Sequence, residues 1–347
     1  MLKLRWSKLL IVCILSLCFC FPTSIQRCEG LQRQQNQQNH VSGDYIYTVE
    51  KGGAVIQEYT GHELHCQIPQ LLDVYPVVGI GDSAFYNKRF LRSLSMPDTI
   101  EWIGSEAFDS CDLLREICWS ENLCSVGDAA FADCFSLEKV HLPESLKVIP
   151  FGMFVRCTHL KEVTCASDVT SIGEQAFWGC SRLKDFVFPT ALTELGEMAF
   201  KECESLKRII LPDGIKEIKY EAFMECTRLK TVQLPRQLEE IGEGAFAQCW
   251  SLNAIRIPDS VEYISEMAFN GCRSRMVLIG KEGSAAQQYC SEERNEDVAF
   301  QNADTGEITP CKHPILHDLF FGINLWGGKI ITLPILFYGY LVHFFVR

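Results

Sequence analysis

Residues 172–192 read IGEQAFWGCSRLKDFVFPTAL, and the same pattern returns every 23 residues through the middle of the chain. Its phenylalanine recurs without insertion or deletion at Phe85, Phe108, Phe131, Phe154, Phe177, Phe200, Phe223, Phe246 and Phe269. A repeat unit of this size cannot bury its own apolar face, so consecutive units must stack on each other. The period therefore predicts a solenoid in which each repeat forms one coil.

A cysteine keeps the same period, three residues after the phenylalanine. It is present at Cys111, Cys134, Cys157, Cys180, Cys203, Cys226, Cys249 and Cys272, whereas the first repeat has Lys88. Cysteines that repeat once per coil are expected to stack about 4.8 Å apart and to point the same way. Because a disulfide needs side chains that are directed toward each other, we predict a ladder of buried, unbridged thiols.

The second half of each repeat has the pattern of a strand. In residues 206–212, LKRIILP, the core positions Ile209 and Leu211 alternate with Arg208 and Ile210, as in a strand with one inward face. The Ile-Gly-(Asp/Glu)-x-Ala-Phe segment favours a short helix or 3₁₀ turn, because Gly permits a tight entry and acidic residues suit a helix start. The predicted fold is an α/β leucine-rich-repeat solenoid with 23-residue coils, a parallel β-sheet on one face and short helices or 3₁₀ turns on the other.

This combination of an Ala-Phe pair, a cysteine and a Leu-Pro strand end resembles the BspA-like, or TpLRR-type, leucine-rich repeats, and it extends over residues 77–279. Residues 45–50, YIYTVE, are similar to that family's N-terminal coil, and residues 283–286, GSAA, to its C-terminal flank. The resemblance implies a protein that is secreted or displayed at the cell surface and binds host or matrix proteins, other cells or the wall. Repeats depart from the pattern at Pro150 and Lys219 in place of Gly, and at Ser120 and Ala166 in place of Pro.

Both ends of the chain have the composition of targeting segments. Residues 1–30 carry basic residues and then an apolar run from Leu9 to Phe21, which predicts a signal peptide, with an uncleaved anchor as the alternative. The Gln- and Asn-rich residues 31–42 are predicted to be a linker, residues 43–76 an N-terminal capping coil, and residues 280–312 a C-terminal flank.

Residues 313–347 form a hydrophobic tail. The stretch from Ile330 to Val346 reaches the lower length limit for a membrane-spanning helix. A spanning helix, a cleaved glycolipid-anchor signal and a packed apolar cap all fit this composition. In either membrane interpretation, the repeats lie outside the cytoplasm, and the protein is held at the membrane by the tail or by the glycolipid that replaces it.

Charge and motifs exclude several functions. A net charge of −12 argues against a nucleic-acid partner, whose phosphates need a basic face. The sequence lacks a phosphate-binding Gly loop, a serine nucleophile elbow and a paired-carboxylate signature, so neither catalysis nor a cofactor is predicted. Cys157 and His159 resemble a nucleophile and base, but Cys157 belongs to the ladder. The segment from His62 to Cys66 lacks the H-E-x-x-H order of zinc hydrolases, and we predict a strand edge there and no metal site.

Two further cysteines flank the last coil. A bridge between Cys290 and Cys311 would fix the C-terminal cap to the solenoid, because cross-linking restricts the unfolded chain.

The outward residues of the predicted strands are the candidate ligand-binding face. They are Glu116, Lys139, His141, Glu162, Asp185, Val187, Arg208, Ile210, Gln233 and Arg256. Val187 and Ile210 are apolar residues between charged ones, a composition typical of a protein interface, although a solvated sheet face fits nearly as well. A second column precedes the strands, at Arg92, Arg115, Lys161, Lys184, Lys207 and Lys230. These cations either bind an anion or pair with nearby acidic residues.

The sequence favours a non-enzymatic extracellular protein that binds a protein or a glycan through its strand-lined face, as in adhesion or another cell-surface interaction. The alternative is a structural module that assembles with copies of itself and has no heterologous ligand.

Overall fold

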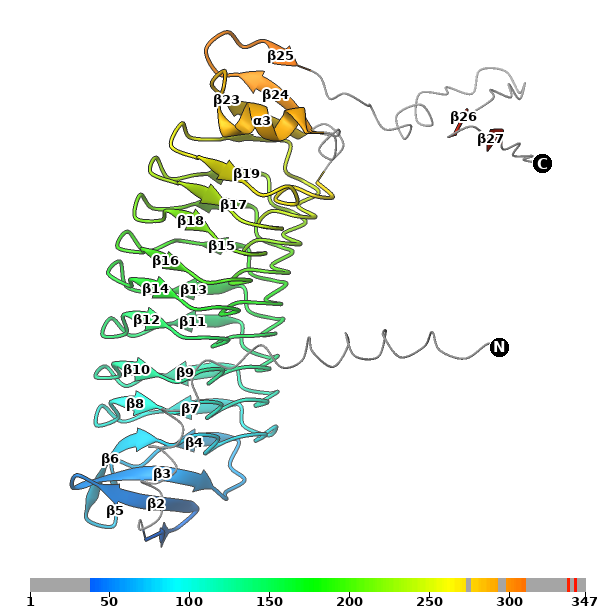
Figure 1. Ribbon diagram of the computed structural model, residues 1–347. Coiled ribbons are helices and arrows are strands. Elements are labelled where there is room, and N and C mark those ends of the chain that lie inside the picture. Colours follow the sequence, from blue (N-terminus) through cyan, green and yellow to red (C-terminus); the bar gives the residue numbers. More distant parts are fainter. Residues whose placement is uncertain (1–37, 273–275, 293–297, 310–335, 338–339, 342–347) are drawn as a thin grey trace, which may run out of the picture.

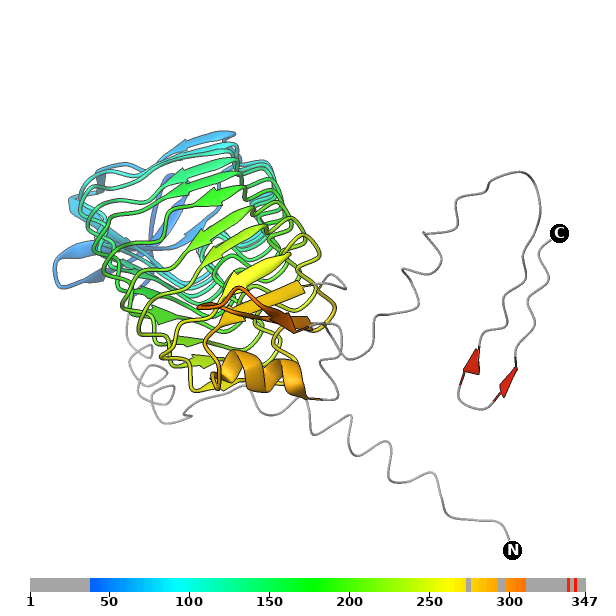
Figure 2. The same cartoon turned by 90° about the horizontal axis from the view of Figure 1, so that it is seen from above.

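The computed structural model describes residues 38–272, 276–292 and 298–309, together with the short strands β26 (Leu336–Phe337) and β27 (Tyr340–Leu341). The first three segments form a stack of coils that runs from the N-terminal strands to α3 and β25 (Figure 1). Seen from above the stack, successive coils overlap and each is displaced a little from the one before it (Figure 2). The predicted leucine-rich-repeat solenoid with parallel strands is confirmed.

One row of strands contains the residues expected to face outward. It comprises β4 (His65–Gln67), β7 (Ser93–Ser95), β9 (Glu116–Cys118), β11 (Lys139–His141), β13 (Glu162–Thr164), β15 (Asp185–Phe186), β17 (Arg208–Ile210), β19 (Thr231–Gln233) and β21 (Ala254–Arg256). We call it the front row. Its strands are parallel, and in most of them a buried residue stands between two exposed ones, as the alternating sequence pattern predicts.

A second row of strands completes each coil. It comprises β6 (Tyr75–Ile80), β8 (Trp102–Ile103), β10 (Ser125–Val126), β12 (Val148–Ile149), β14 (Ser171–Ile172), β16 (Glu194–Leu195), β18 (Glu217–Ile218), β20 (Glu240–Ile241) and β22 (Tyr263–Ile264). We call it the side row. A Gly follows most of these strands and allows close approach, since a Cβ added to Gly173 would lie 2.6 Å from the backbone nitrogen of Phe151 in the preceding coil.

The side row is interrupted where Gly is replaced. Strands β10 and β12 are not paired, and neither are β16 and β18, and the residues after β12 and β18 are Pro150 and Lys219. Gly173 donates its N–H to the Ile149 carbonyl at 2.7 Å, but Pro150 has no N–H to donate to the coil before it. Ser265 is small enough to keep the equivalent bond, to Ile241, at 2.9 Å.

The front row is also divided, into the ladders β4–β7–β9, β11–β13–β15, β17–β19 and one that begins at β21. The predicted parallel sheet is thus present as several separate ladders. Two of the three breaks follow an oversized aromatic residue at an inward position, Trp119 after β9 and Phe188 after β15. Other coils have Leu142 or Leu211 there, each of which donates its N–H to the next coil. The break between β19 and β21 has no such residue to explain it.

The third side of each coil consists of turns, where the sequence predicted short helices or 3₁₀ turns. Residues with positive φ, such as Gln175 (57°) and Gly179 (73°), recur in these turns and are incompatible with a continuous helix. Backbone N–H groups in these turns bond to the next coil instead, as in the 2.8 Å hydrogen bond from the N–H of Phe177 to the carbonyl of Ala199. The acidic residues also serve this stacking, since Asp82 Oδ1 accepts the N–H of Ser105 at 2.8 Å rather than lying at a helix start.

Two columns of side chains fill the core. The repeat phenylalanines are at most 2% exposed and stack with ring centroids 4.8–6.0 Å apart. Tyr59 stacks on Phe85 at one end of the column, and Tyr289 packs edge-on against Phe269 at the other. Beside them runs the cysteine ladder, fully buried except for the half-buried Cys272. Each ladder thiol donates to the carbonyl of a phenylalanine 26 residues earlier, at 3.1–3.3 Å.

The ends of the stack are closed by other elements. At the N-terminus, β1 (His40–Ser42), β2 (Tyr45–Glu50) and β3 (Gly53–Tyr59) are antiparallel, β3 pairs in parallel with β6, and β5 (Leu71–Leu72) also joins β6. Strand β1 thus lies in the last residues of the segment predicted to be a linker. At the C-terminus, β23 (Met276–Gly280), α3 (Ala285–Ser291), β24 (Val298–Asn302) and β25 (Ile308–Thr309) follow the last repeat.

The predicted signal peptide and Cys311 lie outside the described residues, as does nearly all of the predicted tail. The Cys290–Cys311 bridge therefore remains a prediction. Among the described residues, no helix has both the length and the apolar character needed to cross a membrane.

Candidate binding surface

The front row presents all ten residues that the sequence predicted as a binding face. Each of them, from Glu116 on β9 to Arg256 on β21, is exposed. They belong to successive coils, so their order on the surface follows the order of the repeats. Some of the charged residues on this face form ion pairs between neighbouring strands. Lys139 on β11, for example, lies 3.0 Å from Glu162 on β13.

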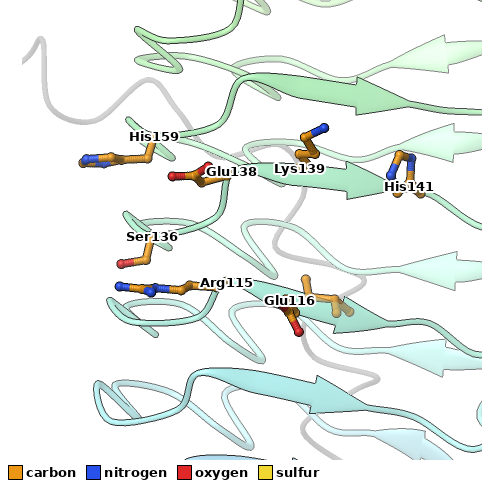
Figure 3. A pocket seen from close by; sticks show the side chains of 8 residues that line it. Arg115, Glu116, Ser136, Glu138, Lys139, His141 and His159 are labelled. Carbon is orange, nitrogen blue, oxygen red and sulfur yellow. The ribbon is translucent and has the colours of Figure 1, made fainter.

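A hollow of about 640 Å³ lies at the break between β9 and β11. It is lined by Arg115, Glu116, Ile117, Ser136, Glu138, Lys139, His141 and His159, which come from neighbouring coils (Figure 3). Trp119 packs below this break, edge-on to Phe131 at 5.1 Å, and its buried Nε1 has no hydrogen-bond partner among the described residues. An aromatic residue in the core is thus associated with a hollow on the surface.

The hollow contains groups of both charges. Lys161 bonds to Glu138 at 2.7 Å, and this hydrogen bond and charge lower the pKa of the Glu138 carboxyl. The ring Nδ1 of His141 bonds to Thr164 Oγ1 at 2.7 Å, which fixes the orientation of the ring. Arg115 has no ion pair in the described part of the chain. The arrangement suits a polar or zwitterionic ligand surface better than an apolar one.

A second hollow of similar volume lies at the break between β19 and β21. Gln233 and Arg256 line it, together with Arg236 and, from the C-terminal flank, Lys281 and Asp304. The predicted surface residues Gln233 and Arg256 therefore line a hollow together with residues that the repeat pattern did not identify as candidates.

The break between β15 and β17 exposes apolar side chains instead. Phe186 and Phe188 turn inward and pack against each other at 4.9 Å and against Phe200 at 5.0 and 5.3 Å. Val187 between them is 84% exposed, and Ile210 at the same position of the next coil is 39% exposed. Sequence periodicity identified Val187 and Ile210, but it gave no sign that the ladder would stop between them.

Only part of the basic column is paired with acidic residues. Lys161 is half-buried and bonded to Glu138, whereas Lys184, Lys207 and Lys230 are exposed and have no ion pair among the described residues. Arg182 and Arg228, which the column did not include, lie two residues before Lys184 and Lys230 and are also exposed.

The other sequence candidates are dispersed. Cys66 is buried near Tyr45, with 3.5 Å between sulfur and hydroxyl oxygen, while His65 bonds to Ser93 and His62 contacts Phe90. No three metal-ligating side chains gather within the described residues. Cys157 is fully buried, and burial raises its pKa well above the ordinary value, which disfavours the nucleophilic thiolate.

Comparison with known proteins agrees with this architecture. The family model for the BspA-type leucine-rich-repeat region, with six copies, matches residues 78–207 and 160–276. Among solved structures, a leucine-rich-repeat protein of T. pallidum is 28% identical, with 62% of this chain and 91% of that chain covered and a TM-score of 0.46.

A leucine-rich cell surface protein of Faecalibacterium prausnitzii is 25% identical, with 71% of this chain and 89% of that chain covered and a TM-score of 0.43. No curated protein matches the chain. The two family-model matches together span more than half of the sequence and lie within the repeats at residues 77–279. The chain therefore belongs to the BspA-type leucine-rich-repeat family.

Proposed function

We propose that this chain is a non-enzymatic extracellular protein that binds another protein or a glycan through its front row. The observation that carries this proposal is the contrast between a repeated core and a varied surface. Buried positions repeat phenylalanine, cysteine and leucine, whereas the exposed positions between them carry acidic, basic, polar and aliphatic residues. A repeat scaffold that holds different side chains in a regular array is suited to recognising a large partner.

Location outside the cytoplasm is supported by the sequence of the N-terminus. Basic residues followed by the apolar run Leu9–Phe21 are typical of a secretory signal. The hydrophobic tail at residues 313–347 would then hold the protein at the membrane of the cell that makes it.

A role without catalysis is supported by the dispersal of the reactive groups. The buried Cys157 thiol and the separated His62, His65 and Cys66 side chains do not converge on a common point at which a substrate could react.

Self-assembly is the competing function, and the ends of the stack favour it. Val41 on the edge strand β1 is 70% exposed, and Ile308 on the edge strand β25 is 54% exposed. Unpaired edges with apolar residues are the surfaces through which strands of separate chains pair.

The test is a binding measurement with the full chain on a panel of extracellular-matrix proteins, cell-surface proteins and glycans. The test variant replaces the front-row residues Lys139, Arg208, Ile210 and Arg256 by Ala. A matched variant replaces three lysines and one aliphatic residue on or beside the side row, Lys147, Val148, Lys216 and Lys219, by Ala.

Saturable binding that is lost in the front-row variant and kept in the side-row variant supports the proposal. Equal loss in both variants, or concentration-dependent self-association with no bound ligand, contradicts it.

A further inference from the structure

Six cations lie on three successive coils, either on or shortly before the front-row strands β15, β17 and β19. They are Arg182, Lys184, Lys207, Arg208, Arg228 and Lys230, in the segments 181–187, 204–210 and 227–233. All six are exposed, and the structure gives none of them a side-chain hydrogen bond or ion pair with another described residue. The same segments contain only two acidic residues, Asp185 and Glu204. We call this group the basic patch.

The basic patch is unusual in this molecule. Acidic residues exceed basic ones by 12 over the whole chain, and Lys161, the cation at the position of Lys184 on the preceding coil, is paired. Arg156 pairs with Asp133, and Lys161 with Glu138. Stacked like charges repel each other, so unpaired cations on consecutive coils cost stability unless a ligand neutralises them. An anionic partner supplies that neutralisation.

An apolar site adjoins the basic patch. Val187 and Ile210 occupy equivalent positions on neighbouring coils. Val187 lies three residues after Lys184, and Ile210 lies two residues after Arg208. Val187 is more exposed than any other large hydrophobic residue that the structure describes. It is held outward because Phe186 and Phe188 on either side of it are anchored in the aromatic core.

Together the two features favour a peptide over a glycan. A sulfated or carboxylated glycan satisfies the cations but brings little apolar surface to cover Val187 and Ile210. An acidic peptide segment with an apolar side chain satisfies both, as in interfaces with an apolar centre and a charged rim. Coils about 4.8 Å apart place three coils within reach of a short extended peptide, which advances about 3.3 Å per residue.

We propose that the basic patch and the Val187–Ile210 pair form a binding site for an acidic peptide segment of a protein partner, whose apolar side chain covers Val187 and Ile210. This inference rests on the proposed binding function and specifies the partner's chemistry. The Lys and Arg side chains hold the carboxylates, and the aliphatic pair selects among acidic sequences.

The test uses the full chain and short dye-labelled peptides, with fluorescence anisotropy as the readout. One peptide alternates Asp and Glu with Leu and Phe, a second replaces Leu and Phe by Ser, and heparin oligosaccharides serve as the glycan probe. The variants are Lys184→Ala with Lys207→Ala and Lys230→Ala, and Val187→Ser with Ile210→Ser. The charge control is Lys147→Ala with Lys216→Ala and Lys219→Ala. Circular dichroism verifies that each variant is folded.

We expect the Leu- and Phe-containing peptide to bind the parent protein. The three-lysine variant should weaken it by about tenfold or more, whereas the charge control leaves it within about twofold. The Val187–Ile210 variant should bind the Leu- and Phe-containing peptide several-fold more weakly, whereas its affinity for the Ser peptide should be unchanged. No binding to the parent, equal weakening by the charge control, or tighter heparin binding that ignores Val187 and Ile210 overturns the inference.

Failure of this inference is distinguishable from failure of the proposed function. A matrix or surface ligand that requires Lys139 and Arg256 but is unaffected by the Lys184–Lys207–Lys230 and Val187–Ile210 variants would leave the front row as a binding face and remove this site. Absence of any ligand for the full chain would remove both.

Discussion

At the scale of single residues, the cysteine ladder shows how a thiol, which is a reactive group when exposed, can have a purely structural role in the core. The ladder thiols lie in the core, and each donates to a phenylalanine carbonyl. Burial raises the pKa of Cys111 from 9.0 to about 12, and it raises the pKa of Cys272 to about 12 as well. The neutral thiol is therefore the form that the fold stabilises.

We predict that the ladder thiols do not react with a thiol reagent in the native protein at neutral pH. The exposed Cys118 and Cys124 should be labelled readily. Mass spectrometry of the labelled peptides, before and after denaturation, measures this. Labelling of Cys157 or Cys203 in the native protein at the rate of Cys118 would contradict the packing described above.

The same pKa shifts predict a loss of stability at alkaline pH. Below pH 9.0 the thiols are neutral in both states, but between 9.0 and about 12 the unfolded chain releases protons that the folded one retains. The free energy of unfolding should therefore fall as the pH rises above 9, by up to about 1.4 kcal/mol per pH unit for each buried thiol. Urea unfolding between pH 7 and pH 10 measures it, and replacing Cys203 by Ala should reduce the slope. A flat profile above pH 9 would exclude this linkage.

At the scale of elements, the repeat period predicts the strands and their inward residues, because burial imposes the same choice on every coil. It does not predict where the ladders break. The inward positions at two of the breaks require only an apolar residue, and Trp119, Phe186 and Phe188 all meet that requirement. Their large size matters only in the folded stack, where they contact Phe131 or Phe200. The turns were expected to be helical or 3₁₀ because the sequence signals of a helix start and of a tight turn are similar.

Phe186 and Phe188, the two inward aromatic residues at the break between β15 and β17, are called the aromatic wedge. We predict that replacing them with smaller residues allows β15 to pair with β17. The double variant Phe186→Val and Phe188→Leu has the residue types of the paired coils, where Leu211 donates its N–H to Gln233 at 3.1 Å. The backbone amide at position 188 should then bond to the Ile210 carbonyl and exchange more slowly with deuterium. Amide exchange at position 188 that is as fast as in the parent protein would show that the wedge does not cause the break.

At the scale of the whole molecule, stability is carried by contacts between neighbouring coils. The phenylalanine column runs from Tyr59 to Tyr289 without interruption, and each ring contacts the rings before and after it. In such a stack each coil depends on its neighbours, so a central defect affects more of the chain than a terminal one.

We predict that Phe177→Ala costs about 3–5 kcal/mol, as for other large-to-small core substitutions, and Phe269→Ala less, because Phe269 lies beside the last coil. Urea unfolding followed by circular dichroism measures both free energies. The central variant should also broaden the transition, since it separates the stack into two parts. An equal cost for the two substitutions would contradict unfolding governed by neighbouring coils.

The stack of coils and its inward residues could be predicted from the sequence because nine repeats solve the same packing problem in the same way. The binding surface was predicted less completely. Val187 and Ile210 follow from strand alternation, but Arg182 and Arg228 enter the basic patch only when coils are stacked side by side. The hollow at β9 and β11 lies at a break in the ladder beside Trp119, and the repeat pattern of the sequence does not predict that break.

Hydrogen–deuterium exchange of the full chain with a saturating ligand from the binding panel tests the central claim most directly. Protection concentrated in front-row strands, with the side row and the edge strands β1 and β25 unchanged, is the result that we predict. Protection confined to β1 and β25, or present without ligand and dependent on protein concentration, would contradict recognition through the front row and favour self-assembly.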